Sequence, residues 1–125
     1  MITRIVAATL LLTASAVSFA LDIKPYSAQA LSTEQRAGKP VTLHFHAEWC
    51  PTCRAQEKVL QQWKGDASVP GTVLVVNYDK EKELRKQLGV RTQSTLIVYQ
   101  GNVEKVRLAG DTDPDKLRAA LLSAN

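Results

Sequence analysis

The pattern of apolar and polar positions divides the chain into short segments that alternate between strand and helix. Residues 72–78 form a nearly unbroken run of apolar and β-branched side chains, which is typical of a strand buried on both faces. Residues 41–46 and 95–99 are also predicted to be strands, and a turn at 100–102 joins the latter to a further strand at 103–108. The pattern therefore predicts four strands, of which the last two form a hairpin.

Helix-forming segments separate these strands. The second of them has Pro51 in its first turn, where the missing N–H of proline costs little. Asp79 is expected to cap the third helix and Gly89 to end it. The order of elements predicts an α/β domain with a central mixed β-sheet that is covered by helices on both faces. The four helices are expected at 27–37, 51–64 and 80–88 and from Asp113 and Pro114 onward.

Residues 1–20 differ in composition from the rest of the chain. Arg4 is their only charge, an apolar run follows at 5–17, and small residues precede a cleavage point after Ala20. This order is typical of a secretory signal peptide, and the apolar run is shorter than the roughly 20 residues that a membrane-spanning helix needs. We therefore expect a signal peptide at 1–20, one domain at 21–125 and a periplasmic location, which is an oxidising environment. A retained membrane anchor is the alternative.

The charge of the chain argues against one class of function. The sequence of 125 residues has 16 Lys and Arg against 12 Asp and Glu, a net charge of +4, which falls to +3 if Arg4 leaves with the signal peptide. The basic residues are interspersed with acidic ones and form no basic stripe with aromatic residues between them. Nucleic-acid binding is therefore not expected.

The two cysteines of the chain lie in the segment Trp49-Cys50-Pro51-Thr52-Cys53. A C-x-x-C motif between a strand and a helix predicts a redox-active dithiol. Its spacing suits the chemistry, because one thiolate forms a mixed disulfide with a substrate and a second, nearby thiol resolves it. The start of a helix also favours the thiolate of Cys50. A purely structural disulfide is the alternative, but so small a ring removes little entropy from the unfolded chain.

This motif and the order of elements resemble the thioredoxin superfamily over residues 38–122, most of the expected domain. The segment 47–53 is similar to the family's active-site segment, and 89–91 with 95–99 resembles its second active-site loop and strand. The resemblance implies a thioredoxin-like fold and an extracytoplasmic protein thiol–disulfide oxidoreductase that needs no cofactor. The implied partners are protein thiols or disulfides and a second dithiol protein, and we expect a monomer.

The resemblance also implies roles within the motif. Cys50 is the exposed, attacking cysteine and Cys53 the buried, resolving one, while Pro51 and Thr52 are the variable pair that tunes the redox potential. Trp49 is expected to shield the dithiol and to offer an apolar surface to a protein substrate. The small size of the domain favours a reductase or electron-transfer protein, but the sequence leaves the direction of electron flow open.

The chain departs from the family pattern in the second active-site loop. Most members have a cis-proline just before the position of Thr95, where this chain has Gln93 and Ser94. A cis bond before a non-proline residue costs about 2.5–4 kcal/mol, so the Gln93–Ser94 bond is expected to be trans and the loop to be reshaped beside the sulfurs. The Ser94 hydroxyl is then a candidate hydrogen-bond donor to a thiolate.

His44 is the second departure, because many thioredoxins bury a carboxylate there, beneath the resolving cysteine. One interpretation makes its neutral imidazole the base that takes the proton of Cys53. The other makes it a residue that is hydrogen-bonded within the strand. His46 shares the same face of the strand and is expected to line the site, and Glu48 is expected to be a solvated charge at the rim.

Two functions of other classes stay open. A metal-binding or metal-delivery module is the main alternative, because two imidazoles and two thiols within ten positions are ligands suited to zinc or copper. An adaptor with this fold but without turnover is the third, and the presence of both cysteines weakens it. The ligands of the metal hypothesis are His44, His46, Cys50 and Cys53.

Overall fold

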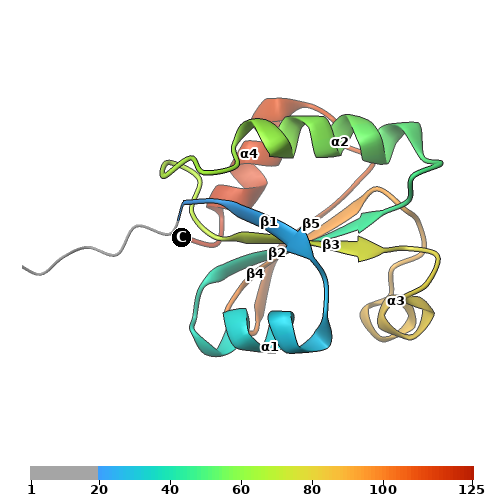
Figure 1. Cartoon of the computed structure of the whole chain (residues 1–125), viewed down its shortest axis with the longest axis horizontal. Coiled ribbons are helices and arrows are strands. Elements are labelled where there is room, and N and C mark those ends of the chain that lie inside the picture. Colours follow the sequence, from blue (N-terminus) through green and yellow to red (C-terminus); the bar gives the residue numbers. More distant parts are fainter. Residues whose placement is uncertain (1–19) are drawn as a thin grey trace, which may run out of the picture.

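A computed structural model describes residues 20–125, which form a five-stranded sheet between two layers of helices (Figure 1). The signal peptide expected at 1–20 lies, apart from Ala20, outside the described residues. None of the helices in the described part combines the length and apolar character needed to cross a lipid bilayer. The elements in chain order are β1 (Asp22–Pro25), α1 (Ala28–Arg36), β2 (Pro40–His46), α2 (Pro51–Gln62), β3 (Thr72–Asn77), α3 (Lys82–Leu88), β4 (Thr95–Gln100), β5 (Val103–Ala109) and α4 (Pro114–Leu122).

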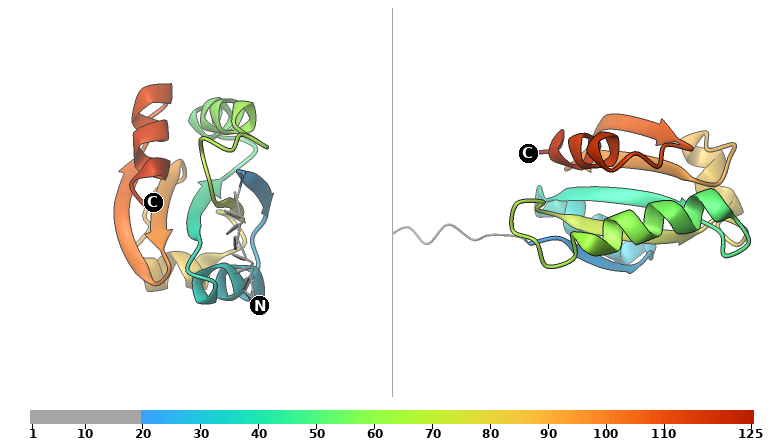
Figure 2. Two further views of the ribbon diagram at one scale, coloured as in Figure 1. Left: turned by 90° about the vertical axis from the view of Figure 1, so that its left-hand side faces the viewer. Right: turned by 90° about the horizontal axis from the view of Figure 1, so that it is seen from above.

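The sheet has the strand order β1-β3-β2-β4-β5, so β2 is the middle strand. Strands β1 and β2 run parallel to β3, whereas β4 is antiparallel to both β2 and β5. Helices α1 and α3 cover one face of the sheet, and α2 and α4 cover the other (Figures 1 and 2). The predicted α/β architecture, a mixed sheet with helices on both faces, is confirmed.

Strand β1 is an element that the sequence pattern misses. It has only four residues, and both of its ends, Asp22 and Pro25, are exposed. Pairing with β3 makes it a strand, since Asp22 lies beside Thr72 and Pro25 beside Val75 in parallel register. A segment this short and polar takes its conformation from its neighbour in the sheet and not from its own propensity.

Successive side chains of β2 point to opposite faces of the sheet, and this alternation places the two histidines. Leu43 and Phe45 lie in the apolar core on the side of α1 and α3. His44 and His46 point to the other side, where each lies close to a side chain of α2. The strand thus brings two imidazoles beneath α2, the helix that begins within the cysteine motif.

The start of α3 differs from the sequence prediction. The helix begins at Lys82 with Glu81 as its N-cap residue, and no side chain caps it. The expected cap by Asp79 is therefore wrong, because the carboxylate of Asp79 accepts a hydrogen bond from Trp49 instead. The predicted end of the helix is confirmed, since Gly89 adopts the left-handed backbone conformation, with φ of 66°.

Strand β5 forms the edge of the sheet opposite to β1. Most of its residues are exposed, among them Glu104, Lys105 and Arg107. The Arg107 guanidinium lies 2.7 Å from the carboxylate of Glu104 and also donates a hydrogen bond to the carbonyl of Leu88 at the end of α3. This edge therefore carries exposed charges of both signs, next to the exposed apolar Val103 at its start.

Candidate active site

The two cysteines lie at the start of α2, and both are free thiols. Cys50 has an extended backbone and is the N-cap residue, and Pro51 follows at the first helical position. The backbone N–H of Cys53 donates to the Cys50 sulfur over 3.1 Å. A helix start supplies unpaired N–H groups and a positive dipole end, so this geometry stabilises negative charge on the Cys50 sulfur.

Both cysteines are buried. Cys50 is 3% exposed and Cys53 is fully enclosed, so the expectation that Cys50 is an exposed residue is wrong. The two cysteines form a small cluster with Ala47, against which Tyr78 packs. These neighbours, which helix-start chemistry alone does not reveal, leave little of Cys50 in contact with solvent.

Burial sets the acidity of the second cysteine. The pKa of Cys53 is raised to about 11; burial is the largest cause and the hydrogen bond with Cys50 contributes, while backbone hydrogen bonds with Ala47 and Ser94 act in the opposite direction. The Cys53 thiol points at the carbonyl oxygen of Phe45, 3.8 Å from its sulfur. Cys53 is thus a protonated thiol at neutral pH and must lose its proton before it can act as a nucleophile.

His44 is a buried, neutral imidazole. Burial lowers its pKa to about 4, the hydrogen bond with Gln56 raises the pKa, and the neighbouring His46 lowers it. Its Nε2 lies 2.9 Å from Oε1 of Gln56 on α2, and among residues 20–125 no hydrogen bond joins it to Cys53. Of the two interpretations of His44, the structure therefore favours the hydrogen-bonded one, with its partner in the helix above and not in the strand.

Gln56 is a residue of the site that sequence reasoning missed. It is fully buried, and its side-chain amide donates to the carbonyls of Ser94 (3.0 Å) and Asp111 (2.9 Å). A signal was present in the helical period, because Cys53, Gln56 and Leu60 fall on one face of α2 and all three are buried. A polar residue within such an apolar stripe points to a buried hydrogen-bond network.

The loop before β4 matches the sequence prediction in its trans peptide bond, but the Ser94 hydroxyl does not have the predicted partner. All peptide bonds in the described range are trans, so the prediction for Gln93–Ser94 is confirmed, and Ser94 adopts a positive φ of 63°. Its hydroxyl donates to the Gln93 carbonyl within the loop and not to a sulfur, whereas its N–H donates to Phe45 over 2.9 Å. Thr95 is buried, and its hydroxyl donates to the Thr92 carbonyl. The loop therefore presents its backbone to the dithiol.

His46 lies at the edge of the site between two carboxylates. Its Nε2 is 3.0 Å from Glu57 and its Nδ1 is 3.8 Å from the exposed Glu48, and its ring meets that of His44 edge-on at 5.5 Å. No three His, Cys, Asp or Glu side chains in residues 20–125 are arranged to hold a metal ion. The spacing that suggested a metal ligand set thus does not produce one in the fold, and the metal hypothesis gains no support.

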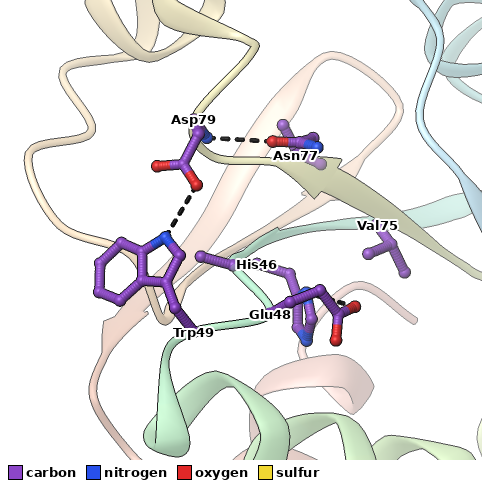
Figure 3. A pocket seen from close by; sticks show the side chains of 8 residues that line it. His46, Glu48, Trp49, Val75, Asn77 and Asp79 are labelled. Atoms are coloured by element: carbon purple, nitrogen blue, oxygen red, sulfur yellow. Dashed lines mark hydrogen bonds and ion pairs between the residues drawn. The ribbon is translucent and has the colours of Figure 1, made fainter.

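A cavity of about 250 Å³ opens beside the tryptophan of the motif (Figure 3). Trp49 is 59% exposed, and its indole N–H donates to Asp79 over 2.8 Å. Figure 3 shows His46 and Glu48 on the other side of this cavity. Trp49 therefore offers an apolar surface next to the dithiol, and Pro51, which follows Cys50, is also exposed.

The fold and the paired thiols define a thioredoxin-like thiol–disulfide oxidoreductase, and comparisons with known proteins agree. The thioredoxin family model matches residues 24–123, so the chain belongs to the thioredoxin family. It is 32% identical over 83 residues to a thioredoxin of Alicyclobacillus acidocaldarius, covering 66% of this chain and 79% of that protein. It is 33% identical over 91 residues to a thioredoxin of Pseudomonas aeruginosa, covering 72% of this chain and 82% of that protein.

A solved structure gives the same result at the level of the fold. The crystal structure of Trxlp from Edwardsiella tarda EIB202 superposes with a TM-score of 0.73 at 37% identity, covering 79% of this chain and 97% of that one. Family membership supports protein thiol–disulfide oxidoreductase activity, with protein thiols and disulfides as its substrates.

Proposed function

We propose that this chain is an extracytoplasmic thioredoxin in which Cys50 and Cys53 of the Cys-Pro-Thr-Cys motif are the redox pair, acting as a reductase or electron-transfer protein. The carrying observation is the asymmetry of the two sulfurs. Cys50 accepts an N–H at the helix start, whereas the raised pKa of Cys53 keeps its thiol protonated. Cys50 is therefore suited to attack the substrate in the first step and Cys53 to react in the second, as the two-step exchange requires.

The reductive half-reaction uses both sulfurs in turn. The Cys50 thiolate attacks a substrate disulfide, a mixed disulfide forms, and the first substrate sulfur leaves and takes up a proton. Cys53 then loses its proton and attacks the Cys50 sulfur, which forms the Cys50–Cys53 disulfide and releases the second substrate thiol. Two electrons pass from the dithiol to the substrate, and the oxidative direction is the reverse of these steps.

Insulin reduction tests the proposed activity. The wild-type protein, with dithiothreitol as the source of electrons, is expected to precipitate the insulin chains, and Cys50→Ser is expected to lose this activity. Gln61→Met, which changes an exposed residue of the same helix and keeps both sulfurs, is the matched control. Equal activity of Cys50→Ser and the wild type would overturn the assignment of the attacking sulfur.

The proposed direction of electron flow is tested by the equilibrium reduction potential against glutathione. A value near about −270 mV, the general figure for thioredoxins, supports a reductant, whereas one near about −120 mV indicates an oxidant. The small domain, in which the structure describes nine elements and one sheet, supports the first of these.

The extracytoplasmic location is supported by the composition of residues 1–20. Cell fractionation followed by mass spectrometry of the exported protein tests it. The expected product begins at Leu21. Recovery of full-length protein from the cytoplasm alone would contradict the proposed location without affecting the redox assignment.

A further inference from the structure

We propose that Gln56 is a positioning residue that holds the Ser94 loop against the resolving cysteine. The inference rests on the proposed redox role of Cys53. It starts from the unusual position of this amide, which is fully buried on the redox helix, three residues beyond Cys53.

The Gln56 side chain joins three segments of the chain, namely β2, the loop before β4 and the loop before α4. Its two N–H groups donate to the carbonyl of Ser94 in the loop before β4 and to the carbonyl of Asp111 in the loop before α4. Its oxygen pairs with Nε2 of His44 on β2 at 2.9 Å. Three of the four hydrogen-bonding positions of the amide are therefore used.

These contacts fix the orientation of each partner. Since both donors of the amide face carbonyl oxygens, its own oxygen must face His44. The Nε2 atom of His44 must then carry the hydrogen and donate it. A buried network with its partners satisfied in this way is rigid and has one arrangement.

The Ser94 end of the network adjoins the dithiol. The Ser94 carbonyl accepts from Gln56 and from the N–H of Gly110 (3.1 Å). The Ser94 N–H donates to the same Phe45 carbonyl at which the Cys53 thiol points. Gln56 and Cys53 are thus linked through one residue of the loop.

The loop needs such a support because of its backbone conformation. Ser94 has a positive φ of 63°, which a residue with a side chain adopts at a cost of roughly 1–2 kcal/mol. Such a conformation persists only where the surroundings hold it in place. The Gln56 amide donates one of the two hydrogen bonds to the Ser94 carbonyl and so helps to stabilise this backbone conformation.

The step that depends on this support is the second one. In it Cys53 loses its proton and its sulfur bonds to Cys50, the bond from Cys50 to the substrate sulfur breaks, and that sulfur leaves as a thiolate that takes up a proton. The Ser94 N–H donates to the Phe45 carbonyl at which the Cys53 thiol points, and the Ser94 backbone acts to lower the pKa of Cys53. Release of the loop should therefore slow the second step and leave the attack by Cys50 unchanged.

Rapid-quench kinetics with a peptide disulfide separates the two steps. In Gln56→Met, which keeps the side-chain size and removes the amide, we expect the mixed disulfide to form at the wild-type rate. Its decay should slow roughly tenfold, the effect of about one net hydrogen bond. Gln56→Glu, which removes the two donors but keeps an acceptor, should slow the decay similarly.

Two variants on the same helix serve as controls. Gln61→Met removes an exposed amide, and Val59→Ala removes apolar contacts with the core without touching the network. Both should keep the two rates within about twofold of the wild type, as distant substitutions do. Amide hydrogen exchange at Gly110 should be faster in Gln56→Met than in either control.

Three outcomes overturn the inference. A normal decay rate in both Gln56 variants excludes it, and so does a parallel loss of both rates, which marks a merely structural role. If neither variant folds, His44→Leu is measured instead, because it leaves the Gln56 oxygen without its hydrogen-bond donor and frees the amide to turn. A decay rate and a Gly110 exchange rate in His44→Leu that both equal those of the wild type then exclude the inference. A wild-type protein that never forms the mixed disulfide instead overturns the proposed function.

Discussion

The indole N–H of Trp49 donates to the carboxylate of Asp79 across 2.8 Å, and this bond ties the loop before α2 to the loop after β3. The two residues are 30 positions apart in the chain. The bond holds a half-exposed aromatic ring in one orientation next to the redox pair. A fixed aromatic surface at this place is suited to a protein substrate.

Asp79→Ala releases the ring, and we expect the reduction of a protein disulfide to fall by roughly three- to tenfold, in line with the loss of one hydrogen bond. The reduction of a small disulfide, which does not use the ring, should change little. Asp79→Asn keeps an acceptor oxygen and is the control. The comparison of insulin with oxidised glutathione measures the difference, and an equal loss with both substrates would contradict this account of Trp49.

Cys53→Ala should convert the transient mixed disulfide into a stable one, because the sulfur that resolves it is gone. Non-reducing electrophoresis of the protein isolated from cells should show covalent adducts of Cys50 with other proteins. The variant that combines Cys53→Ala with Cys50→Ser should show none. Absence of adducts in Cys53→Ala would argue against protein substrates.

His44 should make the free energy of unfolding dependent on pH. The pKa of His44 is about 4 in the folded protein, against the ordinary value of 6.5 for the unfolded chain. Between these two pH values the unfolded chain binds a proton that the folded protein excludes. The stability contributed by the neutral ring is fully present above pH 6.5 and is lost as the pH falls towards 4, by about 3 kcal/mol in total.

Urea unfolding at several pH values measures this loss. His44→Leu is the reference, because it keeps every carboxylate of the chain and removes only the imidazole. The pH dependence of the wild type should exceed that of the variant between pH 6.5 and 4. Parallel curves for the two proteins would show that His44 does not stay neutral in the fold.

Gly71→Ala should destabilise the protein through a close backbone contact. A Cβ at this position would lie 2.5 Å from the carbonyl oxygen of Pro40, and the φ of 117° is unfavourable for any side chain. We expect a loss of at least about 2 kcal/mol. Gly38→Ala, which meets open space at φ of 68°, should cost only about 1 kcal/mol. Equal melting temperatures of the two variants would contradict the contact.

Local patterns predict the elements that a few neighbouring residues determine. The apolar run at 72–78 becomes β3, and Pro51 after Cys50 starts α2, because both signals act within one element. The trans bond before Ser94 is likewise a property of the peptide unit itself. These parts of the fold and the position of the dithiol follow from the sequence.

Contacts between distant segments are not visible in such patterns. Gln56 donates hydrogen bonds to Ser94 and Asp111, which are 38 and 55 positions away in the chain. The sequence around Gln56 does not indicate these partners. Asp79 lies where a helix-capping residue is expected from the local sequence, but its carboxylate accepts a hydrogen bond from Trp49 of another loop. The buried cluster that contains Cys50 likewise includes a contact with Tyr78, which lies beyond β3.

Strand β5 leaves one border of the sheet available to any extended polypeptide. Glu104, Lys105 and Arg107 place charges of both signs along it. An incoming strand would have to strip water from these groups before it could join the ladder. The charged border therefore opposes edge-to-edge joining of two such sheets, the first step of fibril growth.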